Sequence, residues 1–276
     1  MPLAPPRTLS PSKVSSFKDC ALAFRFSVID KVPEPPSLPA SRGTLVHAAL
    51  ERLFGLVHVA RTPEAAAACL ATAWDQLRTD PEFTGLDLDA DGEAQLLADA
   101  GALIGNYFAL EDPRAVTPIG LELMLSVPLG GVVLRGIIDR LELDDDGELV
   151  VTDYKTGRAP SERYEQARFD GVNFYSYLCE QLFGKRPARV QLLYLADPVA
   201  ITAVPTDQTT RGLRTKVGAV WQAVERACAN DDFRPRTGPL CNWCNFKEFC
   251  PAYGGDPTRA RFAAREARTG EVPLPL

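Results

Sequence analysis

Residues 136–157 read GIIDRLELDDDGELVVTDYKTG, and this stretch decides the fold that we expect. Two runs of alternating apolar residues flank Asp-Asp-Asp-Gly, a pattern typical of two β-strands joined by a tight turn. A three-residue loop ending in a left-handed glycine sets one register. In that register the facing pairs are Asp139 and Asp153, Leu141 and Val151, Leu143 and Leu149, and Ile137 and Lys155. A two-residue turn would send Asp139 to the other face, and the matched apolar pairs argue against it.

One face of this expected hairpin is apolar near the turn and ends in Asp139, Asp153 and Lys155. A half-buried face rarely carries three charges by chance, because burying an unpaired charge is costly. One interpretation is a salt bridge at the edge of the sheet. The other is a metal site, in which the two carboxylates bind Mg²⁺ or Mn²⁺ and Lys155 faces the attacking water or a substrate phosphate. The hairpin alone leaves both interpretations open.

Two longer strings make the pattern more specific, namely G-x-x-D-R at 136–140 and D-Y-K-T-G at 153–157. Together they resemble the PD-(D/E)XK nuclease superfamily, above all the RecB-family exonucleases and the CRISPR-associated and AddB-type iron–sulfur nucleases. The resemblance implies a restriction-endonuclease-like α/β fold with a mixed central sheet flanked by helices. It also implies that Asp139 and Asp153 bind the metal, with the backbone carbonyl of Tyr154 as a further ligand.

An early helix carries a third element of this resemblance. Residues Arg42 to His47 match R-G-x-x-x-H, in which the histidine is a further metal ligand. Imidazole suits Mn²⁺ better than Mg²⁺. Without the resemblance, a partly buried, hydrogen-bonded side chain is the simpler interpretation of a lone histidine. The same resemblance makes Lys155 the catalytic lysine.

The seven cysteines divide into two sets. Cys241-Asn-Trp-Cys244 and, after five further residues, Cys250 form a spacing typical of a soft metal or an iron–sulfur cluster, and Cys20 is the candidate for a fourth ligand. This arrangement resembles the staple of the iron–sulfur nucleases, which implies a [4Fe–4S] cluster joining the N- and C-terminal parts. A structural zinc site is the competing interpretation. The cysteines expected in the core are Cys69, Cys179 and Cys228.

At 276 residues, with 46% hydrophobic and 24% charged residues, the chain has the composition of a soluble globular protein. The net charge of −6 argues against binding nucleic acid through global charge, although a local basic groove is compatible with it. No apolar run is long enough to span a membrane, and the start lacks the core of a signal peptide. We therefore expect a cytoplasmic protein without a membrane partner.

We expect one nuclease domain over residues 1–276. Its parts are N-terminal helices with the first cysteine and the histidine (10–60), a helical segment (61–115), a catalytic α/β core (116–230), the cysteine loop (238–253) and a tail (256–276) that is either a frayed helix or disordered. Residues 1–9 are Pro-rich and are expected to form a loose arm. Ser10 followed by Pro11 predicts the start of a helix that reaches Phe26 and carries Cys20 in its second half.

Further candidate site residues lie on a strand and a helix. Glu122 belongs to a strand expected from Thr117, where it either reaches the metal site or, more simply, faces solvent or forms a salt bridge. A helix is expected at 161–183. In the family that the chain resembles, the corresponding helix carries a Gln and, one turn later, a Tyr that position the substrate strand. Here that pattern is imperfect, and a plain amphipathic helix is the simpler interpretation. The candidate substrate contacts are Arg42, Gln166, Asn173, Tyr175 and Tyr177, with Tyr154 and Trp243 as further candidates for stacking on bases.

The resemblance implies a metal-dependent DNA exonuclease of the RecB-like group that hydrolyses phosphodiester bonds. The expected cofactors are Mg²⁺ or Mn²⁺ and the [4Fe–4S] cluster. The expected substrate is single-stranded DNA ends, in DNA repair, recombination or a related process with a helicase or another DNA-processing partner. Two alternatives stay open: a nuclease-fold DNA-binding module without turnover, and a structure-selective endonuclease with a zinc staple.

Overall fold

The structure is a computed structural model that describes the backbone of residues 2–160 and 162–269, and the side chains in these ranges except at 162–170, 172 and 266–269. The chain divides into two compact units. The first comprises Met1–Pro35, Val127–Arg135 and Gly212–Leu276, and the second comprises Pro36–Ser126 and Gly136–Arg211. Among the described helices, none combines the length and the apolar character needed to cross a membrane.

The second unit begins with a helical layer. Helices α3 (Leu38–Phe54), α4 (Pro63–Leu77) and α6 (Ala90–Tyr107) pack against one another, with the short helices η2 (His58–Ala60) and α5 (Pro81–Thr84) in the connections. The side chains of Thr62 and Asp89 cap α4 and α6 by accepting backbone N–H bonds of 3.2 and 2.8 Å. The core between the helices is fully buried at Leu45, Leu50, Ala73 and Ala100, among others. The helical segment expected at 61–115 thus contains α4, α5 and α6.

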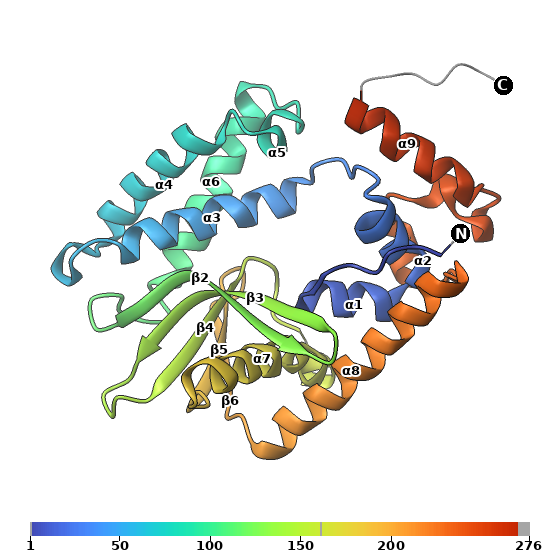
Figure 1. The fold of residues 1–276 in the computed structure, drawn as a ribbon. Coiled ribbons are helices and arrows are strands. Elements are labelled where there is room, and N and C mark those ends of the chain that lie inside the picture. The colour runs from blue at the N-terminus through green and yellow to red at the C-terminus, as the bar shows by residue number, and fades with distance from the viewer. Residues whose placement is uncertain (1, 161, 270–276) are drawn as a thin grey trace. The chain divides into compact units, whose positions relative to one another are not determined.

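A mixed sheet follows, as predicted. Its strands are β2 (Thr117–Leu129), β3 (Val132–Leu143), β4 (Leu149–Lys155), β5 (Arg189–Tyr194) and β6 (Val199–Ala203). Strand β2 pairs with β3, β3 with β4 antiparallel, β4 with β5 parallel and β5 with β6 antiparallel. Helix α7 (Glu162–Phe183) makes the crossover that the parallel β4–β5 pair requires. Helices α3, α4 and α6 lie along one side of the sheet and α7 along the other (Figure 1).

The central hairpin has the predicted register. Leu141 pairs with Val151 and Leu143 with Leu149, and Gly147 adopts φ +73° in the turn. The pairing continues to Arg140 opposite Thr152. At the next step, where Asp139 would oppose Asp153, the β4 backbone instead donates a hydrogen bond to the Asp139 side chain. Asp139 therefore lies just beyond the end of the β3–β4 backbone ladder, where its side chain takes the place of a backbone acceptor.

The first unit is built from both ends of the chain. Strand β1 (Thr8–Leu9) pairs in parallel with Val133 and Leu134 of β3, and Leu9 is fully buried. The prediction of a loose arm is therefore wrong at Thr8 and Leu9, because parallel pairing and burial of one leucine outweigh the Pro-rich composition. The Ser10 cap of α1 (Pro11–Asp19) is confirmed, since its side chain accepts the Lys13 N–H at 3.2 Å.

The predicted continuous helix from Ser10 to Phe26 is wrong. Helix α1 ends at Cys20, whose backbone is extended (φ −158°, ψ 110°), and the chain restarts as α2 (Ala21–Phe24) and a π-helical segment, η1 (Arg25–Asp30). Apolar spacing alone did not reveal the break, because the apolar residues on either side keep helical spacing. Cys20 consequently lies at a junction between helices.

The C-terminal part of the first unit follows α8 (Asp207–Asn230), a helix whose end belongs to this unit. Three short 3₁₀ helices carry the cysteine loop: η3 (Pro239–Trp243), η4 (Lys247–Phe249) and η5 (Pro251–Tyr253). Helix α9 (Pro257–Thr269) resolves the alternatives for the tail in favour of a helix over this range. Its Arg261 pairs with Asp231 at 3.1 Å, which joins α9 to the end of α8.

Candidate active site

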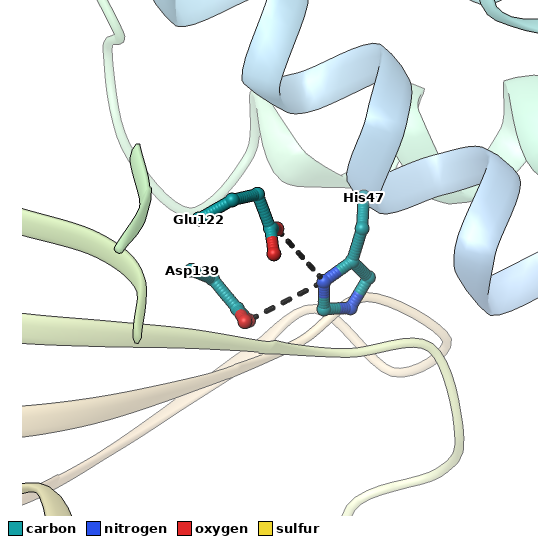
Figure 2. A group of neighbouring side chains, drawn as sticks. All are labelled: His47, Glu122 and Asp139. Carbon is teal, nitrogen blue, oxygen red and sulfur yellow. Dashed lines mark ion pairs between the residues drawn. The ribbon is translucent and has the colours of Figure 1, made fainter. Parts of the chain in front are cut away.

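Three possible metal donors converge from three elements of the second unit (Figure 2). His47 lies on α3, Glu122 on β2 and Asp139 on β3. His47 Nδ1 lies 3.5 Å from Asp139 Oδ2 and 3.7 Å from Glu122 Oε1, and one donor atom from each residue lies within 4.8 Å of the others. Among the residues that the structure describes, this is the one group of three His, Cys, Asp or Glu donors gathered so closely.

Glu122 reaches this group because its backbone departs from strand geometry. Its φ is +41°, in the left-handed region that residues other than glycine rarely adopt. The four residues 120–123 are all half-buried, so the alternation of β2 is lost around Glu122. Strained backbone of this kind clusters at functional sites. The structure thus favours the interpretation in which Glu122 reaches the site over the one in which it faces solvent.

Asp139 is held from the neighbouring strand. Its side chain is 9% exposed, and its Oδ2 accepts the backbone N–H of Tyr154 at 2.6 Å. The edge of the His47 ring packs on the Tyr154 ring, with centroids 5.9 Å apart. Tyr154 therefore contacts two of the three converging residues, one through its backbone and one through its ring.

Asp153 and Lys155 form the next part of the site. The Asp153 carboxylate is 5% exposed and pairs with the Lys155 ammonium, whose side chain is 43% exposed. Burial, and then the negative charge of Asp139, raise the pKa of Asp153 to about 6. Partial burial would lower the pKa of Lys155, but the Asp153 carboxylate outweighs this and raises it. A protonated ammonium thus lies beside the carboxylates with part of its surface open.

The carboxylates also act on the histidine. Burial opposes the charged imidazole, yet the hydrogen-bonding Asp139 and Glu122 carboxylates outweigh it and raise the pKa of His47 to about 10. A proton on His47 therefore neutralises part of the acidic cluster in the absence of another cation. A metal ion needs a neutral imidazole and would replace that proton as the countercharge.

A glycine lets α7 approach the site. A Cβ at Gly136 would lie 2.9 Å from Leu178 Cδ1 and 3.0 Å from Tyr175 Cε1, so any larger residue would force these side chains to shift. Burial, and then the nearby charge of Asp153, raise the pKa of the Tyr175 hydroxyl. Of the predicted substrate contacts, Tyr175 is thus the one brought against a site carboxylate.

The other predicted substrate residues that the structure describes either form contacts within the protein or are buried. Arg42 Nη1 pairs with Asp99 Oδ2 at 3.0 Å, and Asn173 is half-buried on α7. Tyr177 is 5% exposed, so it belongs to the core and does not present its ring to a ligand. The side chain of Gln166 lies outside the described residues.

The two rings proposed for stacking differ sharply. Tyr154 is 4% exposed, and its ring is enclosed by the helical layer, which argues against contact with a base. Trp243 is 83% exposed on η3 of the first unit. Trp243 therefore remains a candidate, whereas Tyr154 contributes to the inside of the site.

The donor set fits a hard divalent cation. Carboxylate oxygens are the ligands preferred by Mg²⁺, and an added imidazole suits Mn²⁺. The electrostatics favour a positive charge here, because burial and then the charge of Asp139 raise the pKa of Asp153, while Asp139 and Glu122 raise the pKa of His47. Asp153 stands outside the closest group of three and would complete the set from β4.

The four thiols of the predicted staple lie together in the first unit. All four line a cavity of about 450 Å³, and none of them forms a disulfide. The Cys20 sulfur accepts the Arg236 N–H at 3.5 Å, which brings the early cysteine to the start of the late loop. The three other cysteines are buried, as predicted: Cys69, Cys179 and Cys228.

Comparison with known proteins agrees with this arrangement. A family model described as the PD-(D/E)XK nuclease superfamily matches residues 8–251, which is most of the chain. The chain belongs to the PD-(D/E)XK nuclease superfamily. The fold of this superfamily uses divalent metals, and the matched range contains the converging His47, Glu122 and Asp139.

Similar proteins are known from sequence and from structure. This nuclease is 24% identical to the "Gene 69 protein" of Mycobacterium phage D29, over 88% of this chain and 96% of that protein. It is 26% identical to the "Gene 69 protein" of Mycobacterium phage L5, over 48% of this chain and 44% of that protein. A solved structure described as "Putative exonuclease" from Eubacterium rectale matches with a TM-score of 0.54 and 12% identity, over 86% of this chain and 87% of that one. The last likeness concerns the fold alone.

Proposed function

We propose that this nuclease is a metal-dependent DNA exonuclease of the RecB-like group that degrades single-stranded ends. The observation that carries the proposal is the convergence of His47, Glu122 and Asp139 beside the Asp153–Lys155 pair. A salt bridge alone would account for Lys155 and Asp153. It would not account for two further carboxylates and a histidine gathered at the same place, one of them on strained backbone.

The ligands of the metal in this proposal are His47, Asp139 and Asp153, with the backbone carbonyl of Tyr154, and Glu122 is added to them by its position. A bound Mg²⁺ or Mn²⁺ would supply Lewis acidity toward the scissile phosphate and favour deprotonation of the attacking water. The protein holds the donors in place through the Tyr154 N–H on Asp139 and through the α3 helix that carries His47.

Lys155 is the catalytic residue that faces the substrate in this scheme. Its ammonium is protonated, since the pKa is raised by Asp153, and its side chain is 43% exposed. It can therefore donate to a phosphate oxygen, or orient the water, while Asp153 fixes its position. A donor directed at charge that develops in the transition state stabilises that state more than the ground state.

We further propose that Cys20, Cys241, Cys244 and Cys250 bind a [4Fe–4S] cluster that joins the two ends of the chain. Their shared cavity and the contact of Cys20 with Arg236 support this assignment. Single-stranded DNA as the substrate is what the resemblance to the RecB-family exonucleases implies. Repair or recombination, with a helicase or similar partner, is the setting that this activity suits.

The test is digestion of end-labelled linear single-stranded DNA, linear duplex DNA and circular single-stranded DNA with Mg²⁺, with Mn²⁺ and with EDTA. We expect metal-dependent shortening of the linear single strand, slower attack on the duplex and intact circles. Degradation of circles at the rate of linear strands would make the protein an endonuclease. DNA binding without cleavage under either metal would instead make it a binding module.

A further inference from the structure

Arg140 is a fully buried arginine that the proposed chemistry does not use. It follows Asp139 on β3, and successive strand residues project to opposite faces, so it lies behind the site carboxylate. Its side chain is 0% exposed and pairs with Glu111 and with Glu142. The geometry of the Glu111 contact is that of a fork, because both terminal nitrogens of Arg140 donate to it.

The same guanidinium reaches across to β4. Arg140 Nη1 donates to the Tyr154 hydroxyl at 2.8 Å, and Nη2 donates to the Thr152 hydroxyl at 3.2 Å. Tyr154 lies between Asp153 and Lys155, and its N–H holds Asp139. Fixing the far end of the Tyr154 side chain thus fixes the strand segment that carries both catalytic groups.

Arg140 also contacts the helix that carries the histidine. Its guanidinium lies 4.5 Å from the ring centroid of Phe54, which is on α3 seven residues after His47. Residues seven apart lie on the same face of a helix, so Phe54 and His47 both point at the sheet. One side chain therefore touches all of the elements that present His47, Asp139, Asp153 and Lys155.

Stability alone is a poor explanation for this arrangement. Burying charged groups costs about as much free energy as their mutual attraction returns, and apolar residues of similar volume often stabilise a protein as well or better. A planar fork with five donors does offer something that an apolar residue cannot, namely fixed directions toward several partners. Arg140 lies directly behind the donor set, so these fixed directions hold the elements that carry the donors.

We propose that Arg140 is a positioning residue that sets the spacing of the metal donors, acting through Tyr154 on β4 and through Phe54 on α3. The inference rests on the proposed metal site and extends it to a side chain that touches neither metal nor DNA. Residues that orient metal ligands from behind typically contribute 10- to 100-fold in metal affinity or activity.

Two tyrosines of the same cluster give a matched test. The Tyr154 hydroxyl accepts from Arg140 Nη1 at 2.8 Å. The Tyr107 hydroxyl, on α6, donates to Glu111 at 2.6 Å, accepts from Arg140 only at 3.5 Å, and belongs to no element that carries a metal donor. Tyr154→Phe and Tyr107→Phe each remove one buried hydroxyl from one network. The measurements are Mn²⁺ affinity by calorimetry without DNA, the melting temperature, and cleavage of linear single-stranded DNA.

We expect both substitutions to lower the melting temperature by similar amounts and only Tyr154→Phe to weaken Mn²⁺ binding, by about 10-fold. Equal Mn²⁺ affinity in the two variants would overturn the inference and leave a structural cluster. A wild-type protein that binds Mn²⁺ but does not cut DNA would overturn the proposed function, while the comparison of the two tyrosines would still decide the role of Arg140. A wild-type protein without Mn²⁺ affinity would overturn both.

A second pair of variants keeps the test decisive if Tyr154→Phe folds poorly. Arg140→Lys keeps the charge but places its donors on a single nitrogen, whereas Arg140→Met keeps much of the volume and has neither charge nor donor. We expect Arg140→Lys to retain part of the Mn²⁺ affinity that Arg140→Met loses, since a lysine can serve one partner but cannot form the fork. Wild-type Mn²⁺ affinity in the folded fraction of both variants would contradict the positioning role.

Discussion

The two candidate metal sites of this nuclease are built in different ways. The donors of the carboxylate site lie on two long strands and one long helix, and three of them already lie within 4.8 Å of one another. The thiols lie on 3₁₀ turns and at a break between helices. Although all four cysteines are among the described residues, no three of their sulfur atoms meet the same limit.

The spacing of the thiols bears on which metal they suit. In a Cys₄ zinc site, a Zn–S distance of about 2.3 Å in tetrahedral geometry places the sulfur atoms ~3.8 Å apart. In the proposed cluster each sulfur would bind a different iron, which requires a wider spacing than a single zinc ion does. Long strands and helices can thus hold metal donors close together before a metal binds. Short turns depend more on a bound metal to fix the positions of their donors.

The largest expected effect breaks the carboxylate site alone. Asp153→Asn removes a donor charge and the partner of Lys155, so we expect loss of detectable metal-dependent cleavage and weaker Mn²⁺ binding. The control is Asp145→Asn, an exposed aspartate in the turn of the same hairpin, which should cleave as the wild type does. Iron content should be the same in both variants, and its loss in Asp153→Asn would show that the sites are not independent.

The next effect separates catalysis from metal binding. Lys155→Ala should lower the cleavage rate by about 10²- to 10³-fold, because it removes a charge directed at the transition state. Mn²⁺ affinity measured by calorimetry should be kept, since the donors remain. Lys185→Ala, which breaks the pair with Glu148 at the surface, should change neither quantity. Wild-type cleavage by Lys155→Ala would reduce Lys155 to a salt-bridge residue.

A smaller effect is expected at the strained strand residue. Glu122→Gln keeps the shape of the side chain but removes its negative charge near His47. We therefore expect Mn²⁺ affinity to fall by about 10-fold, a smaller loss than in Asp153→Asn. Glu51→Gln, an exposed position one turn after His47 on α3, serves as the control. Unchanged affinity in Glu122→Gln would remove Glu122 from the donor set.

The smallest effect on cleavage is expected from the thiol site. Cys250→Ser should bleach the broad absorbance near ~400 nm of anaerobically purified protein and lower the melting temperature. The cleavage rate per folded molecule should change little, because the carboxylate donors lie on other elements. Cys179→Ser in the core should keep the colour. A colourless wild-type protein with one zinc per chain would replace the cluster with zinc at the same ligands.

Local patterns account for what the sequence predicted well. The register of the β3–β4 hairpin follows from a turn and a few facing pairs, all within about 20 residues, and the ladder that it sets ends at Arg140, next to Asp139. The Ser10 cap and the paired helices of the 61–115 segment are equally local. Such features depend on neighbours in the chain, which is why one sequence suffices to infer them.

The features that were missed depend on distant parts of the chain or on unusual backbone. The Glu122 side chain reaches the site because its backbone has a positive φ, and the sequence pattern does not predict that conformation. Arg140 was visible as part of G-x-x-D-R, but its partner Glu111 follows α6 and is brought to it by packing. Strands β1 and β6 were missed because a two-residue parallel pairing and a half-exposed strand carry weak apolar signals.

The division of the chain has a consequence for the order in which the protein is made. The elements of the carboxylate site all precede residue 212, whereas the first unit needs Met1–Pro35 together with Gly212–Leu276. A ribosome therefore releases everything needed for the nuclease site before it has synthesised the last three thiols. Cys20 must wait for more than 200 residues to follow before the other three thiols exist, so the proposed cluster can form only after the elements of the carboxylate site have been synthesised.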